Sequence, residues 1–159
     1  MRYAMCALGI SRFESHIADL TSHIITYVSD FDIRISNFKY LKGAGMKLKD
    51  IVDKLALKVA AAQDKLDHEV AGGYASDLLS DVMANSREGD IWVTLQVHPN
   101  IIAVATLKDL AGIVIVQGKK PEAQTVEKAQ QEGVPLLVSE LQTFEIIGRL
   151  YNLGISGMR

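Results

Sequence analysis

Polar and glycine residues follow three apolar stretches of the chain, and their types and spacing could bind an anion. Where strands run parallel, the residues after each strand gather at one edge of the sheet, and helices that begin there offer free backbone N–H groups to phosphate or carboxylate. We therefore expect no resident cofactor but a pocket for an adenine nucleotide or another small anionic ligand, formed by Gly72, Gly73, Gln96, His98, Asn100, Gln117, Gly118, Lys119 and Ser139. Each of these residues taken alone could instead cap a helix or close a turn, and only their convergence favours a site.

The stretch GIVIVQGKKP, residues 112–121, raises the question of a kinase phosphate loop. Such a loop needs a glycine, four further residues, Gly-Lys and then a serine or threonine. Here five residues separate Gly112 from Gly118, Lys120 stands at the hydroxyl position, and the interval is itself a strand. We therefore interpret Gly118 as a turn residue, and the two lysines after it either as solvated groups or as weak anion contacts.

A catalytic base or a metal site would need partners that the sequence does not place. His98 follows a strand end, and as a base it would need a carboxylate such as Asp77 or Asp81 within reach. A capping or surface role is the other interpretation. An acidic run that could suggest a metal lacks the spacing of a ligand set, so we interpret it as a solvated loop: Asp64, Asp67, His68 and Glu69. We predict no catalytic residue and no metal site.

The composition excludes several classes of function. The chain has 159 residues and a formal net charge of -2, so no basic excess indicates binding to nucleic acid or to an anionic membrane. No apolar run approaches the roughly 20 residues of a membrane-spanning helix, and the opening residues lack the pattern of a signal peptide. The single cysteine, Cys6, excludes an internal disulfide. We expect a cytoplasmic protein with no nucleic-acid and no membrane partner.

From Met46 onwards, helical and strand patterns alternate along the chain. Leu48, Ile51 and Leu55 share one face of a helix, and 112–116 has the apolar residues of a strand buried on both faces. We expect helices at 46–57, 75–86, 98–110, 121–133 and 139–154, and strands at 57–62, 91–97, 112–116 and 134–138. This order predicts a three-layer α/β/α sandwich around a mostly parallel sheet of about four to five strands.

Three local features accompany this pattern. The AGGY stretch, residues 71–74, is expected to break the chain after a strand that starts within 63–70. Ser76 or Asp77 is expected to cap the helix that follows. Ser139 and Gln142 are expected to form a capping box at the start of the last helix.

Residues 1–45 show no consistent helical or strand pattern. Lys42, Gly43 and the start of Ala44 can be encoded as AAAGGAG, a ribosome-binding sequence, just upstream of Met46. One hypothesis is therefore that 1–45 is mistranslated upstream sequence and that 46–159 is the natural domain. The other is a genuine N-terminal extension, such as a helix used in pairing.

Three stretches are distinctive as a set: GYASDLLSDVMAN, GDIWVTLQVHPNIIAVA and GKKPEAQTVEKAQQEGVPLL. With them the chain resembles, over residues 46–155, stand-alone proteins of the DRTGG-domain family, although the five-letter motif that names this family does not occur. The family is similar to the N-terminal domain of HPr kinase/phosphorylase and to regulatory domains of some phosphotransacetylases and pyrophosphatases.

The resemblance implies a non-catalytic regulatory module that senses a ligand and forms a homodimer or docks on a partner enzyme. The alternative is a small kinase or phosphotransferase related to HPr kinase/phosphorylase. The kinase activity of that enzyme belongs to a separate domain with a phosphate loop, which this chain lacks. The last predicted helix favours pairing, because its apolar residues occupy more than one face: Leu141, Phe144, Ile146, Ile147, Leu150, Tyr151 and Leu153.

Overall fold

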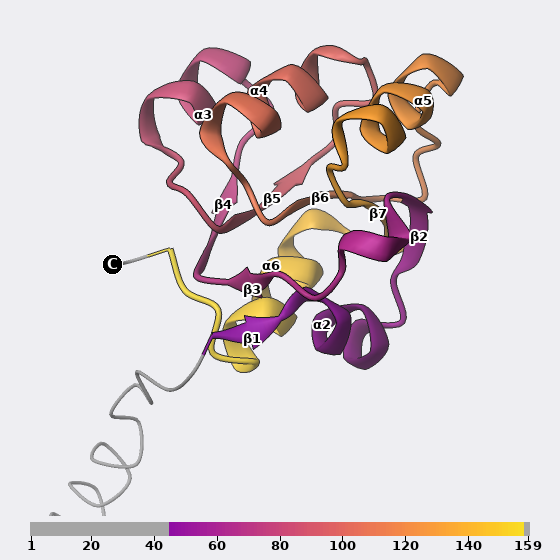
Figure 1. The fold of residues 1–159 in the computed structure, drawn as a ribbon. Helices are drawn as coiled ribbons and strands as arrows, with labels where there is room; N and C mark the ends of the chain where they lie inside the picture. Colours follow the sequence, from indigo (N-terminus) through magenta and orange to yellow (C-terminus); the bar gives the residue numbers. More distant parts are fainter. Residues whose placement is uncertain (1–44, 158–159) are drawn as a thin grey trace, which may run out of the picture. The chain divides into compact units, whose positions relative to one another are not determined.

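The structure of the chain, a computed structural model, describes residues 45–157 and is organised around a five-stranded sheet (Figure 1). In spatial order the strands are β2 (Lys58–Ala61), β7 (Leu136–Val138), β6 (Gly112–Ile115), β5 (Asp90–Thr94) and β4 (Gly72–Ala75). Strands β4, β5, β6 and β7 run parallel, and β2 pairs antiparallel with β7 at one edge. The predicted mostly parallel sheet is confirmed.

Helices cover both faces of this sheet, which confirms the three-layer α/β/α sandwich. One face carries α2 (Leu48–Leu55) and α6 (Thr143–Asn152), together with a small antiparallel pair of strands, β1 (Met46–Lys47) and β3 (Glu69–Val70). The other face carries α3 (Leu79–Asn85), α4 (Asn100–Lys108) and α5 (Ala123–Glu132). A 3-10 turn, η1 (Gln63–Lys65), connects β2 to β3.

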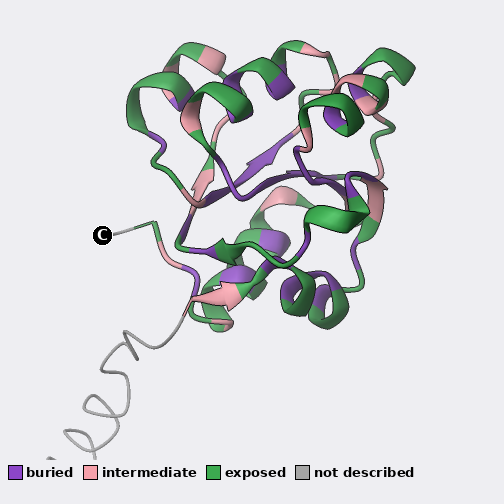
Figure 2. Cartoon of the chain, in the orientation of Figure 1, coloured by how far each residue is buried: buried purple, intermediate pink, exposed green. Residues whose placement is uncertain are grey.

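The core forms two apolar clusters, one on each side of the sheet, because successive residues of a strand point to opposite faces. On β5, Ile91 and Val93 join the cluster under α2 and α6, whereas Trp92 joins the cluster under α3, α4 and α5. Strands β5 and β6 are buried along their whole length, while the outer faces of the helices are exposed (Figure 2). The long apolar run of 112–116 therefore reflects burial on both faces.

The predicted break after the strand ending at Val70 is present but confined to Ala71, because Gly72–Ala75 forms the edge strand β4. The C-terminal segment packs closely on this strand: the N–H of Gly73 donates to the carbonyl of Ser156 at 3.2 Å. A Cβ atom on Gly73 would lie 3.3 Å from Cγ2 of Ile155. Gly73 therefore allows the C-terminal segment to approach β4 closely, which is one of the usual reasons for a glycine inside a strand.

All five predicted helix starts are two to four residues too early, because the helices begin at Leu48, Leu79, Asn100, Ala123 and Thr143. Met46–Lys47 pairs with β3, so the first helix begins at Leu48. Helix α3 begins at Leu79, and among the residues that the structure describes neither Ser76 nor Asp77 caps it; the hydroxyl of Ser76 accepts from the N–H of Leu78 in the preceding turn. Helix α6 begins at Thr143, so the expected capping box is absent from this part of the chain.

Within residues 45–157, the helices are all too short and insufficiently apolar to cross a membrane. Helices α5 and α6 have 10 residues each, which corresponds to a length of about 15 Å against a hydrocarbon core of about 30 Å. The two hypotheses about residues 1–45 concern a segment that, up to residue 44, lies outside the described residues.

Candidate functional site

The carboxyl ends of β4, β5, β6 and β7 lie at one edge of the sheet, which is the usual ligand edge of an open parallel sheet. Backbone hydrogen bonds join the loops after β6 and β7 there. The N–H of Gly118 donates to the carbonyl of Ser139 at 2.8 Å, and the N–H of Gln117 donates to the carbonyl of Leu141 at 2.9 Å. The structure thus brings Gln117, Gly118 and Ser139 together as the sequence predicted.

The loop after β5 joins this edge through the carbonyl of Val97. That oxygen accepts from the N–H of Glu122 at 3.2 Å and from Oγ1 of Thr125 at 2.6 Å. Glu122 and Thr125 stand at the start of α5, so the loops after β5 and β6 are fixed to each other. Three loops from three parallel strands therefore form one connected rim at the carboxyl edge of the sheet, which we call the strand-end rim (residues 95–99, 116–122 and 139–141).

Asp77, from the loop after β4, closes the end of β5. Its Oδ1 accepts from Oγ1 of Thr94 at 2.8 Å and from the N–H of Leu95 at 2.7 Å. Gln96 is exposed, and its Nε2 donates to the carbonyl of Asp77 at 3.2 Å. The sequence pointed to Asp77 as a helix cap or a partner of His98, but the carboxylate is a loop-closing acceptor instead.

His98 caps the first turn of α4 rather than facing a carboxylate. Its Nδ1 lies 3.3 Å from the backbone nitrogen of Asn100 and accepts from that N–H. Both side chains are exposed. A histidine that accepts at Nδ1 while neutral carries its proton on Nε2, so His98 can donate from Nε2 to a ligand at the rim.

A charged corner lies beside Gly118. Gly118 has φ +62, and a side chain there would run into the carboxylate of Glu140. Glu140 pairs with Lys58 at 2.8 Å, and the hydrogen bond and charge of Lys58, with a smaller effect of the charge of Lys120, hold the pKa of the Glu140 carboxyl below its ordinary value. Lys119 and Lys120 are exposed on the same loop.

The sequence reasoning missed both Lys58 and Glu140. Lys58 reaches this corner because it begins β2, which runs antiparallel to β7 and places Lys58 opposite Val138. The residue pattern of a short strand does not show whether it runs parallel or antiparallel to its neighbour, so the position of Lys58 could not be predicted. Glu140 directly follows Ser139, and its position after a strand was the available signal.

Two of the predicted site residues lie elsewhere. Gly72 pairs with Asp90, the first residue of β5, so Gly72 and Gly73 lie at the amino end of the sheet and away from the strand-end rim. Ser139 is at the rim but buried, and its hydroxyl accepts from the N–H of Leu141 at 3.2 Å. Gly118 and Ser139 therefore shape the rim, whereas Gln96, His98, Gln117 and Lys119 present side chains on it.

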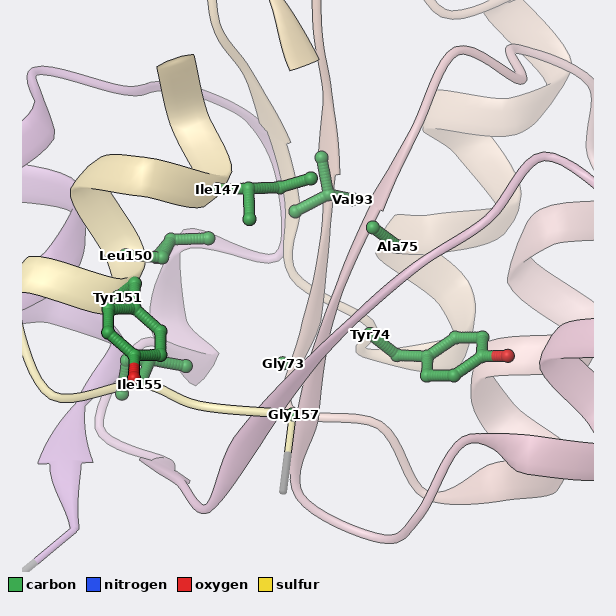
Figure 3. A pocket seen from close by; sticks show the side chains of 9 residues that line it. All are labelled: Gly73, Tyr74, Ala75, Val93, Ile147, Leu150, Tyr151, Ile155 and Gly157. Carbon is green, nitrogen blue, oxygen red and sulfur yellow. The ribbon is translucent and has the colours of Figure 1, made fainter. Parts of the chain in front are cut away.

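Gly73 instead lines an apolar hollow of about 80 Å³ between α6 and the strands β4 and β5 (Figure 3). The other residues around it are Tyr74, Ala75, Val93, Ile147, Leu150, Tyr151, Ile155 and Gly157. Figure 3 shows Ile147 and Leu150 directed towards the strands, and the ring of Tyr74 directed away from them. No local pattern in the sequence indicates this hollow, because it forms between segments that are far apart in the chain.

Tyr74 fastens α3 to β4 through Asp81. The Tyr74 hydroxyl donates to Oδ2 of Asp81 at 2.8 Å, and Nδ2 of Asn85 donates to Oδ1 at 2.7 Å. Hydrogen bonds from Ser76, Tyr74 and Asn85 hold the pKa of Asp81 below its ordinary value. The pKa of Tyr74 is raised, chiefly by the hydrogen bond to Asp81 and then by burial. These contacts give Asp81 a structural role.

The acidic run after β2 forms surface pairs. Asp67 lies 3.2 Å from Nζ of Lys47, and Asp64 lies 3.8 Å from Nζ of Lys65. Within residues 45–157, no group of three or more His, Cys, Asp or Glu side chains comes together in a way that could hold a metal ion.

No model of a known protein family matches the chain, and no curated protein matches it in sequence. Among solved structures, it is similar to the CBS and DRTGG domains of the regulatory region of Clostridium perfringens pyrophosphatase, which was crystallised with its activator, diadenosine tetraphosphate. The TM-score is 0.55 at 15% sequence identity, over 70% of this chain. The fold is DRTGG-like. The chain spans 48% of the length of that solved structure, so the likeness concerns the fold of part of a larger regulatory region.

Proposed function

We propose that the chain is a regulatory module without catalytic activity of its own. It binds a small anionic ligand, such as an adenine nucleotide, at the strand-end rim, and it acts as a homodimer or on a partner enzyme. The observation that carries the proposal is the rim itself: loops from three parallel strands are tied together and carry exposed amide, imidazole and ammonium groups at the usual ligand edge of such a sheet.

Side chains, rather than the loop backbone, must supply the anion contacts at the rim. The N–H groups of Gln117 and Gly118 are both used by carbonyls of the loop after β7. Lys119 and Lys120 are exposed on that loop, and His98 can donate from Nε2. Glu140 opposes an anion, but Lys58 lies 2.8 Å from it and compensates its charge. Lys119 and Lys120 outweigh Glu122 on the same loop, so the strand-end rim together with Lys58 keeps a net charge of +1.

The DRTGG-like fold supports the regulatory part of the proposal. The similar structure is a regulatory region in complex with an activator that is a dinucleoside tetraphosphate. Such a ligand combines adenine rings with several phosphate charges. The side-chain amides of the rim could hydrogen-bond the adenine, and its ammonium groups could bind the phosphates. The homodimer expected from the resemblance to DRTGG domains is also part of the proposal.

The kinase alternative finds little support in the rim. A phosphate loop uses successive backbone N–H groups to cradle phosphates, but the N–H groups of Gln117 and Gly118 are bonded to the loop after β7. Asp77 is held by Thr94 and Leu95 and is unavailable to a base at His98. Incubation of the purified chain with radiolabelled ATP and a cell extract tests this alternative, and transfer of label by the pure protein would overturn the non-catalytic proposal.

Calorimetric titration and thermal shift of the full chain test ligand binding. The probes are ATP, AMP, diadenosine tetraphosphate and inorganic phosphate. We expect a nucleotide to raise the melting temperature, and the double substitution Lys119→Gln/Lys120→Gln to abolish most of this rise. The control is Lys49→Gln/Lys54→Gln on α2, which removes the same charge on the other layer. Equal loss in both variants would mean a nonspecific charge effect, and no response to any probe would refute the ligand.

A further inference from the structure

The charged corner of the strand-end rim already contains an anion, the carboxylate of Glu140. Its Oε1 lies 2.8 Å from Nζ of Lys58. The hydrogen bond and charge of Lys58, and to a smaller extent the charge of Lys120, hold the pKa of Glu140 below its ordinary value. Two cations from separate segments, β2 and the loop after β6, therefore act on one position at the carboxyl edge of the sheet.

Gly118 leaves the space in which this carboxylate lies. It has φ +62, and a Cβ atom there would lie 3.3 Å from the carboxyl carbon of Glu140, with one carboxylate oxygen closer still. The charged group therefore lies directly against the backbone of the turn. Close approach of a ligand to the backbone is one of the uses of glycine in proteins, and here a side chain of the protein takes that place.

The backbone on both sides of Glu140 is held in place, whereas its side chain can move. The N–H of Gly118 donates to the carbonyl of Ser139 at 2.8 Å, and the N–H of Gln117 donates to the carbonyl of Leu141 at 2.9 Å. The Glu140 side chain is 68% exposed, and an exposed ion pair contributes little to stability. The carboxylate can therefore leave the corner while the rim keeps its shape.

We infer that the position of the Glu140 carboxylate is the phosphate subsite of the strand-end rim, and that a phosphate group of the ligand displaces this carboxylate from Lys58 and Gly118. The inference rests on the proposed ligand binding at the rim and assigns its anion position. The displaced side chain turns into solvent, and the phosphate takes its place beside Lys58 and Lys120. Glu140 is thus a competitor built into the chain, and it sets how strongly the rim binds an anion.

This exchange favours ligands that carry more than one negative charge. A ligand carboxylate replaces one charge beside Lys58 with another and gains no ion-pair energy from the exchange. A phosphate group on a single ester bond carries a charge of about -1.5 to -2 at pH 7 and has three strong acceptor oxygens, so it can pair with more than one lysine. The expected ligand class is therefore a phosphate monoester or a polyphosphate such as ATP.

Calorimetric titration of the full chain with ATP tests the displacement. We expect Glu140→Gln to lower the dissociation constant of ATP about fivefold, because the ligand no longer displaces a charge of its own sign. The matched control is Asp67→Asn, which also removes an exposed carboxylate from an ion pair, with Lys47 at 3.2 Å. Asp67 lies between the end of β2 and the start of β4, at the opposite edge of the sheet, so the control should leave the dissociation constant unchanged.

A double-mutant cycle with Lys58→Gln separates displacement from simple repulsion between charges. Without Lys58 the carboxylate loses the partner that holds it in the corner. Glu140→Gln should then improve ATP binding less than about twofold. Repulsion from a distance would give the same improvement in both backgrounds, and that result would overturn the displacement.

Two nucleosides that differ in their anionic group test the charge requirement. Adenosine 5′-carboxylate carries one negative charge where AMP carries nearly two, and it should bind wild type about fivefold more weakly. Equal affinities would contradict a subsite that exchanges one carboxylate for a phosphate.

The outcomes separate the displacement from the wider proposal. No binding of ATP by the wild type or by Glu140→Gln overturns both. Binding that Lys119→Gln/Lys120→Gln weakens, but that Glu140→Gln improves no more than Asp67→Asn does, overturns the displacement alone and leaves ligand binding at the rim in place.

Discussion

The carboxylate of Glu140 occupies the space into which a side chain at Gly118 would project. Gly118 also has φ +62, in the left-handed region that favours glycine. The turn after β6 therefore requires glycine for its backbone angle, whereas the contacting carboxylate belongs to an exposed, flexible side chain that can move. This contact links the loop after β6 to the antiparallel strand β2 across the strand-end rim.

Gly118→Ala is predicted to lower the free energy of unfolding by about 1 kcal/mol through the left-handed backbone angle, because the exposed Glu140 side chain can move aside at little cost. The control Gly133→Ala has φ +68 but only ordinary contacts with Lys65, so it should lose the backbone part alone. In a Glu140→Ala background, Gly118→Ala should cost no more than Gly133→Ala. Urea denaturation measures all of these, and a loss for Gly118→Ala much larger than that for Gly133→Ala in the wild-type background would show that Glu140 cannot move aside.

Asp77→Ala is predicted to destabilise the fold by about 1–3 kcal/mol, because it leaves the hydroxyl of Thr94 and the N–H of Leu95 without their acceptor. Thr94 is buried, so water replaces the lost partner poorly. Asp53→Ala, at an exposed position of α2, should change stability by less than about 0.5 kcal/mol. A loss no larger than that of the control would mean that Asp77 does not hold the end of β5.

Asp81 is predicted to make stability depend on pH in the acid range. Its pKa is lowered in the folded state by hydrogen bonds from Ser76, Tyr74 and Asn85. The stabilisation is therefore fully present above the unfolded value of about 3.9 and is lost as the pH falls through the lower folded value. Asp81→Asn should flatten the decline in unfolding free energy below pH 4, while Asp53→Asn should follow the wild type. An unchanged slope in Asp81→Asn would contradict the assignment.

The layers of the fold could be predicted because they depend on periodicity within each segment. Leu48, Ile51 and Leu55 are buried on one face of α2 as their spacing indicated, and the apolar run of 112–116 became the central strand β6. These patterns need no knowledge of distant residues, since a helix or strand shows its buried face in its own sequence.

The strand-end rim could be predicted only in part because its contacts span long stretches of the chain. Parallel strands put Gln117 and Ser139 at one edge, and alternation alone indicated this. The partners of Asp77 lie 17 and 18 residues later, and Lys58 is 82 residues from Glu140. No local pattern indicates such pairings, so the sequence suggested a helix cap for Asp77 and no role for Lys58.

Gly73 and Ile155 are predicted to be energetically coupled, because they meet across the edge of the sheet. The sequence showed Gly73 as a break, but β4 continues through it, and the C-terminal segment lies against it with Ile155 buried. A Cβ atom at Gly73 would lie 3.3 Å from Cγ2 of Ile155, closer than an ordinary contact, so an added methyl group must displace the isoleucine. Ile155→Ala removes that Cγ2 atom and costs about 2–4 kcal/mol through lost burial.

A double-mutant cycle with Gly73→Ala, Ile155→Ala and the double variant measures this coupling by urea denaturation. Gly73→Ala should be at least about 0.5 kcal/mol more favourable in the Ile155→Ala background than in the wild type, since the crowded atom is gone. The control cycle pairs Ile155→Ala with Gly133→Ala, which lies beside Lys65 rather than the C-terminal segment, and it should be additive. Additivity in the Gly73 cycle as well would show that the C-terminal segment does not pack on β4. Ile155 would then not line the apolar hollow.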